Sequence, residues 1–584
     1  MKKRKVTAFL CAAALLVSGL AGCGTDAEST SGGQEAGKTQ EQATGDTSEK
    51  IELVVGGLDR GNSADNQWWP TEIVQQINEK LNIELKLVNY DQQKLGLDLA
   101  SGELPDVMLV YRQNAESVIK GKHAVALNEY FDTIGKNLAN ERFTFRNNMM
   151  SKYQSGGDGN VYFTTPYVTV EGEGETGASL GIGYAVRWDL YKEIGAPEIN
   201  TPDDYIEAMK KMQELYPETP EGLPTYAMGM YNDVGMHTWG IHGLFDSNYT
   251  SLDNNLMVLI DKETYEVSHN VVNENPDTPF WNDMHFYNKM WKEGLLDPDC
   301  FITKGEDLTA KYTKGQYLGG INNWYYGEYN QNVLKTPGST AGMELLPLYS
   351  TGQGGYFPAG WSDKIMFVSA HSKNIERAVM FLDYINSEEF ARLQYSGVEG
   401  VHWEKGEDGK PVLTDQVIQM KEDPAQADAW SKLSLASWNN WGGIGAEAVL
   451  SDGAPASLWN TPEMLSRGLS PTDKDMCETL GVSYPAEYAQ KRVEEGKCKD
   501  VSGYDQRFAA IMPSVPQDIT RIDGNVNEIV MNALPSLVQA EDDAAFEAAR
   551  EKLIADVKAA NVEQSLKWWQ DSVKTALEEV KSME

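Results

Sequence analysis

The alternation of apolar and polar positions between residues 51 and 112 predicts a repeating strand–helix unit. Apolar residues run together at 51–55, alternate at 83–87 and run together again at 107–110, as buried strands do. The helix between the first two strands has an apolar face made of Trp69, Ile73, Ile77 and Leu81. The next helix ends where Gly102 and Pro105 stop it. This β-α-β-α-β order predicts a parallel sheet with right-handed crossovers.

Further strands and helices follow along the rest of the chain. We expect strands at 185–187, 226–230 and 364–369, and a hairpin within 256–267. We expect helices at 188–194, at 280–293, at 374–386, and from Pro202 onward behind a cap at Thr201. A long helical tail covers 544–580, with an interruption at Lys567, Trp568 and Trp569. The pattern alone therefore indicates an α/β protein.

The chain opens with a basic stretch followed by an apolar one. Four basic residues at 2–5 precede apolar residues 6–20, which are too few to span a bilayer, so residues 1–22 are typical of a secretory signal peptide. Leu20-Ala21-Gly22-Cys23 resembles a bacterial lipobox, which implies cleavage before Cys23 and lipidation of its thiol and new amine. Residues 23–50, rich in small and polar residues, form a flexible tether. We expect the protein to be anchored to the outer face of a membrane without spanning it.

Length and charge narrow the class of protein. The chain has 584 residues, of which 41% are hydrophobic, enough for two or three globular domains. A net charge of -37 argues against nucleic acid or anionic lipid as a partner, and it disfavours highly anionic ligands unless a local Arg overrides it. Beyond the leader and Cys23, the cysteines are Cys300, Cys477 and Cys498. A disulfide between the last two stays open.

Several phrases of sequence, in order, resemble one family. They are Ser101-Gly102-Glu103-Leu104-Pro105-Asp106-Val107 and the stretches at 158–162, 186–190, 291–298 and 375–383. Together with the lipobox and the tether, they resemble the family 1 extracellular solute-binding proteins, in particular the large lipoprotein subgroup that serves sugar ABC importers in Gram-positive bacteria. The resemblance extends to about Gly400, and the carboxyl-terminal third matches only in general character.

The resemblance implies an α/β, two-lobe periplasmic-binding-protein-like (type II) fold with a hinge and a helical C-terminal extension. The chain would cross between the lobes near 184–188 and return near 361–369. The N-terminal lobe would begin with 51–185, the C-terminal lobe would be 186–364, and 365–584 would hold return segments shared between the lobes together with the C-terminal helices. The implied function is capture of an oligosaccharide for an ABC permease by a monomer, without catalysis or cofactor, at the outer face of a Gram-positive cell membrane.

A cleft that binds sugars needs flat rings for the C–H faces and polar groups for the hydroxyls. The chain has 15 Trp and 27 Tyr, and several lie in Gly- and Asn-rich loops. The aromatic candidates are Trp239, Trp324, Tyr325, Trp361, Trp403, Trp438 and Trp441. The other candidates follow strand ends, the crossover or a glycine: Asp59, Arg60, Asn62, Asp65, Tyr111, Arg112, Arg187 and Glu399. Trp69 and Trp291 lie on apolar helix faces and are expected in the core.

Two short motifs match sequence patterns of enzymes, but the strands and helices expected around them do not fit those patterns. Residues 172–177 match G-x-G-x-x-G after a strand-like stretch at 167–170, but 180–186 reads as a strand where a helix is needed, and Glu171, Glu173 and Glu175 would repel phosphate. Residues 177–181 match G-x-S-x-G without the strand before and helix after that a nucleophile elbow requires.

No metal site is expected, because the histidines show no zinc spacing and 212–224 lacks the alternating oxygen ligands of a calcium loop. Two alternatives stay open. The protein could be an extracellular lipoprotein glycosidase that uses two of its many carboxylates. The same fold could also bind a peptide or another small metabolite.

Overall fold

The computed structural model of the chain describes residues 45–58, 71–170, 173, 182–232, 239, 248–252, 255–322, 325–347, 357–360, 364–426, 429–430, 433, 441–501 and 503–583. All of them fall within one unit, residues 43–584. Within these ranges, every helix is too short or too polar to cross a lipid bilayer.

A four-stranded sheet organises the N-terminal lobe. Its order is β10 (Lys364–Val368), β3 (Val107–Tyr111), β1 (Ile51–Leu58) and β2 (Ile83–Tyr90). β1 runs parallel to both β2 and β3, which confirms the arrangement predicted from the sequence. β10 returns from far along the chain and pairs antiparallel with β3, with Lys364 opposite Tyr111.

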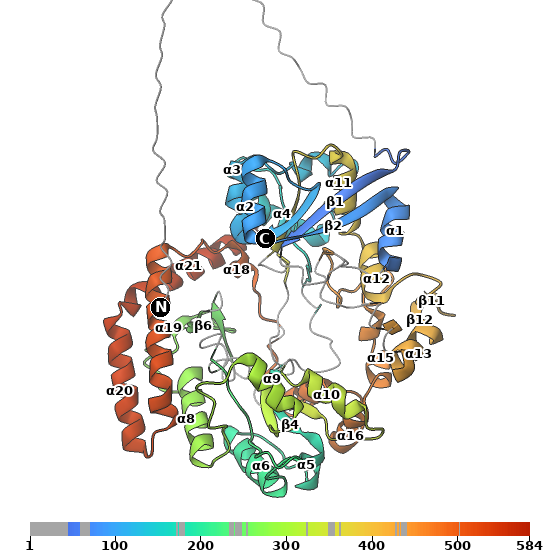
Figure 1. Cartoon of the computed structure of the whole chain (residues 1–584). Helices are drawn as coiled ribbons and strands as arrows, with labels where there is room; N and C mark the ends of the chain where they lie inside the picture. Colours follow the sequence, from blue (N-terminus) through green and yellow to red (C-terminus); the bar gives the residue numbers. More distant parts are fainter. Residues whose placement is uncertain are drawn as a thin grey trace, which may run out of the picture. The chain divides into compact units, whose positions relative to one another are not determined.

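Helices cover both faces of this sheet (Figure 1). α1 (Thr71–Leu81) and α11 (Ile375–Tyr384) share one apolar core with alternate residues of the strands, and Ile73, Ile77 and Leu81 are buried as predicted. α2 (Gln92–Ser101), α3 (Ala115–Lys120) and α4 (Thr144–Tyr153) share the core of the other face. α2 ends at Gly102, whose φ of 76° is the left-handed stop that the sequence predicted.

A three-stranded antiparallel sheet organises the C-terminal lobe. Its order is β8 (Gly319–Asn322), β4 (Ile182–Arg187) and β9 (Met343–Leu346). β4 leads directly into α5 (Trp188–Glu193), and Thr201 caps α6 (Pro202–Leu215) in a reciprocal capping box with Asp204, both as expected. The other helices around this sheet are α8 (Pro279–Lys292), α9 (Gly305–Thr313) and α10 (Gly327–Leu334). Trp291 packs against the core of this lobe, as predicted.

One strand prediction in this lobe is wrong. Residues 226–230 are extended but form no strand, because each neighbour offers only one bridge: Tyr226 pairs with Tyr317 and Met228 with Leu296. The predicted hairpin is present as β6 (Asn255–Asp261) and β7 (Val267–His269), to which β5 (Tyr249–Leu252) adds a third strand. A second hairpin, β11 (Trp403–Lys405) and β12 (Pro411–Leu413), follows α12 (Glu388–Ser396).

The chain passes between the lobes a third time, within residues 365–584. α13 (Asp415–Glu422) and α15 (Pro462–Arg467) contribute Val417 and Met464 to the N-terminal core. α16 (Pro471–Leu480) then places Met476 in the C-terminal core. The passage therefore falls at 468–470. α17 (Glu487–Glu494) follows, and the remaining short helices within the described ranges are Arg112–Asn114, Leu127–Tyr130, Glu141–Phe143, Pro424–Gln426 and Leu458–Asn460.

The carboxyl-terminal region is helical and contacts both lobes. It consists of α18 (Arg507–Ile511), α19 (Gln517–Val538), α20 (Asp543–Ala559) and α21 (Val562–Met583). α19 packs on α8, whereas α18 packs on α4 of the N-terminal lobe and on α21. The predicted interruption at 567–569 is wrong: the break between α20 and α21 lies at Asn561, whose φ is 62°, and Trp569 is buried within α21. Cys477 and Cys498 are buried and form no disulfide.

Candidate functional site

The carboxyl ends of β1 and β3 meet at one edge of the N-terminal sheet, and β10 begins there because it runs the opposite way. Leu58 and Tyr111 end their strands at this edge, and Lys364 begins β10 beside Tyr111. The Lys364 ammonium lies 5.6 Å from the centre of the Tyr111 ring. Arg112 follows Tyr111, and both are half-buried. Ligands of open α/β sheets bind at such an edge.

Asn114 adds an uncommitted acceptor close to this edge. Its amide nitrogen donates to the Gln92 side chain over 3.3 Å, whereas its Oδ1 is buried and accepts no hydrogen bond. Buried polar atoms in folded proteins nearly always have a partner, so this acceptor is available to a water molecule or a ligand.

A fifth extended segment lies outside β10 and brings Tyr167 to the same edge. Thr164 and Met366 exchange backbone hydrogen bonds of 2.9 and 2.8 Å in antiparallel register. Continuing that register puts Pro166 level with Lys364 and Tyr167 one residue beyond the sheet. Tyr167 has a left-handed φ of 58°, and its hydroxyl donates to the Glu447 carboxylate. The sequence gives no sign of this residue's position, because Tyr167 only begins the strand-like stretch at 167–170.

Two tyrosines lie outside the strands of the C-terminal sheet, near one of its edges. The start of β4 at Ile182 and the ends of β8 at Asn322 and of β9 at Leu346 lie at one edge, because β4 is antiparallel to both neighbours. Tyr231 and the candidate Tyr325 share a hydrogen bond between their hydroxyls, with ring centres 5.2 Å apart at 75°. Tyr226, in the segment that leads to Tyr231, pairs in parallel with Tyr317 just before β8, and Tyr231 bonds to Tyr325 just after β8.

Three of the predicted residues have structural roles. Arg187 forms two 2.9 Å bonds to Asp189 and lies over the Tyr216 ring, 4.2 Å from its centre. Trp239 is fully buried, donates its indole N–H to Asn232 over 2.8 Å and stacks on Phe301. Trp441 is fully buried in the N-terminal core. In this structure neither indole presents a face to a ligand.

Glu399 and Trp403 line a separate pocket of about 370 Å³ on the N-terminal lobe, away from Tyr111. The Trp403 indole donates to the carbonyl of Gly397 over 2.9 Å. Arg392 pairs with Asp452 over 2.9 Å and lies 5.9 Å from the Trp403 ring centre. The structure thus divides the predicted residues among several places.

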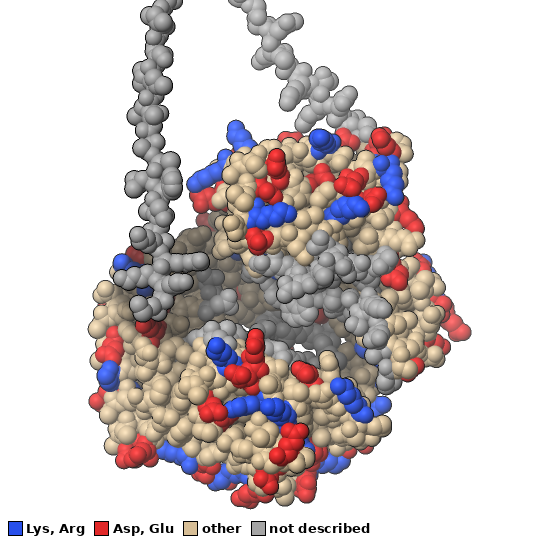
Figure 2. Space-filling view, viewed as in Figure 1, with Lys and Arg blue, Asp and Glu red and all other residues tan. Residues whose placement is uncertain are grey.

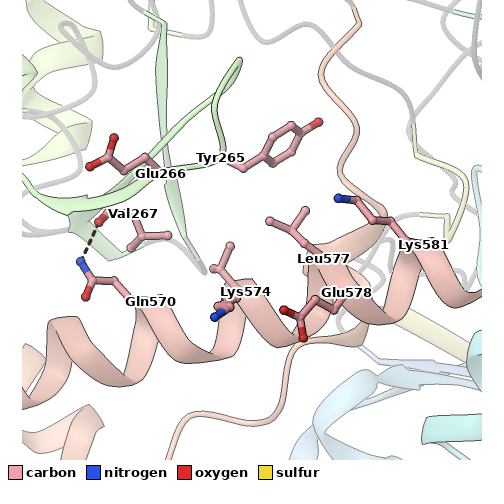
Figure 3. Close-up of a pocket in the computed structure, with 9 residues that line it drawn as sticks. Tyr265, Glu266, Val267, Gln570, Lys574, Leu577, Glu578 and Lys581 are labelled. Atoms are coloured by element: carbon pink, nitrogen blue, oxygen red, sulfur yellow. Dashed lines mark hydrogen bonds between the residues drawn. The ribbon is translucent and has the colours of Figure 1, made fainter.

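A second pocket, of about 420 Å³, lies between the turn after β6 and α21 (Figure 3). Tyr265, Val267 and Leu577 give it apolar surface, while Glu266, Lys574 and Lys581 are charged. The Gln570 side chain donates to the carbonyl of Val267 over 3.0 Å and joins the two elements. No candidate from the sequence lines this pocket.

The other candidates lie outside the described residues. They are Cys23, Asp59, Arg60, Asn62, Asp65, Trp324, Trp361 and Trp438, together with Trp69 and most of the 171–181 stretch. Within that stretch Glu173 is described: it is buried and accepts from both terminal nitrogens of Arg142 and from the backbone of Val170 and Val449. Its carboxylate therefore anchors the chain.

The charge and the shape of the surface can be followed in Figure 2. Acidic and basic side chains are interspersed over the two lobes, and the surface is hollowed between them. Burial raises the pKa of Glu447 above its ordinary value, although the hydrogen bond from Tyr167 opposes this. Among the described residues, no group of three or more His, Cys, Asp or Glu side chains could hold a metal ion.

Comparison with known proteins places the fold. No family model and no curated protein sequence matches the chain. Among solved structures, the alginate-binding protein AlgQ2 without calcium ion is 16% identical, with a TM-score of 0.51 over 90% of this chain and 99% of that one. The ABC-transporter substrate-binding protein FusA of S. pneumoniae, in complex with kestose, is 13% identical, with a TM-score of 0.55 over 91% and 100%.

An HMO-binding, ABC-transporter-associated solute-binding protein from Bifidobacterium longum infantis is similar as well. It is 12% identical, with a TM-score of 0.56 over 90% of this chain and 98% of that one. These neighbours are binding proteins rather than enzymes. The chain therefore has the two-lobe α/β fold of ABC-transporter substrate-binding proteins, with a helical C-terminal region.

Proposed function

We propose that the protein captures an oligosaccharide between its lobes and delivers it to an ABC importer. The observation that carries the proposal is the pair of aromatic strand edges, with Tyr111 and Arg112 on the N-terminal lobe and Tyr325 on the C-terminal lobe. Among the proteins with this fold, FusA was solved with kestose and another is named for HMO binding, which supports an oligosaccharide as the ligand class.

The chemistry of the edges suits sugars. Tyr rings offer an apolar face and a hydroxyl, and the Arg112, Asn114 and Lys364 side chains can bond to sugar hydroxyls. Each neutral hydrogen bond contributes about 0.5–1.5 kcal/mol, so a few bonds and two stacked rings reach micromolar affinity, about -8 kcal/mol. Contacts to both lobes exist together only when the lobes close, so the ligand favours the closed form.

We extend the proposed site to the candidates next to these edges. Asp59, Arg60, Asn62 and Asp65 follow β1 in the sequence, Trp324 precedes Tyr325, and Trp361 precedes β10. Trp438 completes the set. In this proposal Arg187, Trp239 and Trp441 support the site from the interior, and Glu399 and Trp403 belong to the separate pocket on the N-terminal lobe.

The binding proposal is tested by titrating the purified protein with a panel of oligosaccharides and peptides in a calorimeter. We expect one site of micromolar affinity for a glycan, and a loss of at least tenfold on Tyr111→Ala. The released solution is then analysed for shortened sugars. Turnover would identify a glycosidase and contradict the transport role, whereas binding of peptides alone would contradict the ligand class.

We also propose that Cys23 carries a lipid at the outer face of a Gram-positive cell membrane. The lipobox resemblance supports it, and the same proposal divides the chain into a signal peptide at 1–22, a tether at 23–50 and the lobes beyond, as a monomer. Labelled palmitate supplied to expressing cells should enter the wild type and not Cys23→Ala, which should appear in the medium. Equal membrane retention of both would reject the anchor.

A further inference from the structure

We infer that Tyr167 is a second sugar platform on the N-terminal lobe and that the ligand spans at least two sugar units, between Tyr167 and Tyr111. This inference rests on the proposed function. The backbone of Tyr167 is left-handed, with a φ of 58°. A bulky aromatic residue rarely adopts that conformation, so the surrounding structure must hold it there.

Neighbouring backbone holds Tyr167 in this conformation. Its N–H donates to the carbonyl of Gly442 over 2.9 Å, and the next N–H, of Val168, donates to Gly443 over 2.7 Å. A β-carbon on Gly445 would lie 2.8 Å from the Thr169 side chain and 3.5 Å from the Tyr167 ring. Glycine at 445 therefore lets the 442–447 segment approach closely behind the tyrosine.

The direction of the Tyr167 ring is fixed by its hydroxyl. The hydroxyl donates to the Glu447 carboxylate, and burial raises the pKa of Glu447. Tyr167 itself is half-buried, so part of the residue remains accessible. A ring held in one direction loses little conformational freedom when a sugar stacks on it.

The position of Tyr167 relative to Tyr111 sets the ligand length. Tyr111 ends β3, and the 164–166 segment lies beyond β10, so two strand spacings, roughly 10 Å, separate the backbone of Tyr111 from that of Pro166, the residue before Tyr167. One sugar ring is shorter than this separation. A ligand that contacts both tyrosines therefore has at least two linked sugar units.

The test compares Tyr167→Asn with Tyr265→Asn. Asn tolerates a left-handed backbone, so each change removes a ring with little added strain. Tyr265 is the matched control: its φ is 59°, it is half-buried, and its hydroxyl accepts from the N–H of Asp505 over 3.1 Å, but it lines the pocket beside α21 (Figure 3).

We expect Tyr167→Asn to weaken binding of a trisaccharide at least tenfold and to leave the weak binding of a monosaccharide within twofold. Tyr265→Asn should lower the melting temperature and leave both affinities within twofold. A folded Tyr167→Asn protein with wild-type affinity for every length would overturn the inference. If the wild type binds no glycan, the proposed function itself fails, which is a different result.

A second measurement keeps the inference testable if Tyr167→Asn does not fold. Fluorotyrosine is placed singly at position 167 or 265 of the otherwise unchanged protein, and its ¹⁹F resonance is recorded during titration with the trisaccharide. We expect the resonance at 167 to shift in step with saturation and the resonance at 265 to stay in place. A stationary signal at 167, with binding intact by calorimetry, would reject direct contact.

Discussion

Glu344 is a carboxyl group with little access to water. It lies on β9, is 6% exposed, and faces Asp473 of α16. Burial, and then the neighbouring Asp473 carboxylate, raise the pKa of Glu344 well above its ordinary value of 4.5. A group whose pKa is higher in the folded state stabilises the fold at low pH. That contribution is lost as the pH rises above the unfolded value toward the folded one.

We expect Glu344→Gln to remove the loss of stability that accompanies rising pH, because glutamine matches the protonated acid in shape and can donate to Asp473. The free energy of unfolding of the variant, relative to wild type, should increase between pH 5 and 8. The slope is at most about 1.4 kcal/mol per pH unit. Urea denaturation at each pH measures it. Glu478→Gln, at an exposed position of α16, is the control, and equal pH profiles for the two variants would contradict the assignment.

Arg377 ties the residues before β1 to the N-terminal lobe. Its buried guanidinium, on α11, donates to the carbonyls of Leu81 over 2.7 Å, Asn82 over 3.1 Å and Glu49 over 3.4 Å, and also to Asp46. Residues 46–50 are therefore held against the lobe, so they do not behave as part of the flexible tether proposed for 23–50.

We expect Arg377→Met to lower the free energy of unfolding by about 1–3 kcal/mol, because buried carbonyls lose a charged donor. Limited proteolysis should cut the variant faster than wild type at 45–50. Arg467→Met, which removes an exposed pair with Glu422, should change neither quantity appreciably. Unchanged cleavage in Arg377→Met would mean that other contacts hold this stretch.

Local residue chemistry explains which parts of the fold the sequence could predict. Some features depend only on neighbours a few residues away, so the sequence pattern alone predicted them. They are Gly102, the Thr201 cap and the apolar face of α1. Tyr167 depends on partners near 366 and 442–447, and its role follows from pairing far along the chain. Trp239 stood in a glycine-rich loop that resembled a ligand platform, but Phe301 and Asn232 hold it in the core.

At the scale of elements, α21 contacts several elements that lie far from it in the sequence. It packs on β7 and α18, and its Glu579 pairs with Lys152 of α4. Trp569 is 2% exposed, and its indole N–H donates to Asp523 of α19 over 3.1 Å. A Lys-Trp-Trp run reads as an interruption in sequence, but a helix can carry it when one indole has a buried partner. Tertiary contacts, rather than the local sequence, determine the conformation of α21 and of the extended 226–230 segment.

We expect Trp569→Ala to lower the free energy of unfolding by about 3–5 kcal/mol, because it empties a core position and removes a donor from Asp523. Trp568→Ala is the matched control, since Trp568 is only partly buried. Trp568→Ala should lower the free energy of unfolding by clearly less than Trp569→Ala does. Chemical denaturation followed by circular dichroism measures both. Equal costs would mean that α21 is not held through Trp569.

At the scale of the molecule, charge and site chemistry act in opposite directions. The whole chain carries -37, whereas the edge next to Tyr111 holds Arg112 and Lys364. At low salt the long-range field of the molecule reaches about 30 Å, and at 0.1 M only about 10 Å. The affinity for a neutral glycan should not depend on this field at either salt concentration, because its contacts are hydrogen bonds and stacking.

We therefore expect the affinity for a neutral trisaccharide to change less than twofold between 0.01 and 0.5 M sodium chloride. A trisaccharide of the same length carrying a uronate should bind more weakly at low salt and improve as salt screens the acidic surface. Calorimetry at both salt concentrations measures this. Tighter binding of the uronate at low salt would mean that the local Arg112 and Lys364 outweigh the molecular charge. The edge of the N-terminal sheet would then be an anion site, and a neutral ligand would be the wrong assignment.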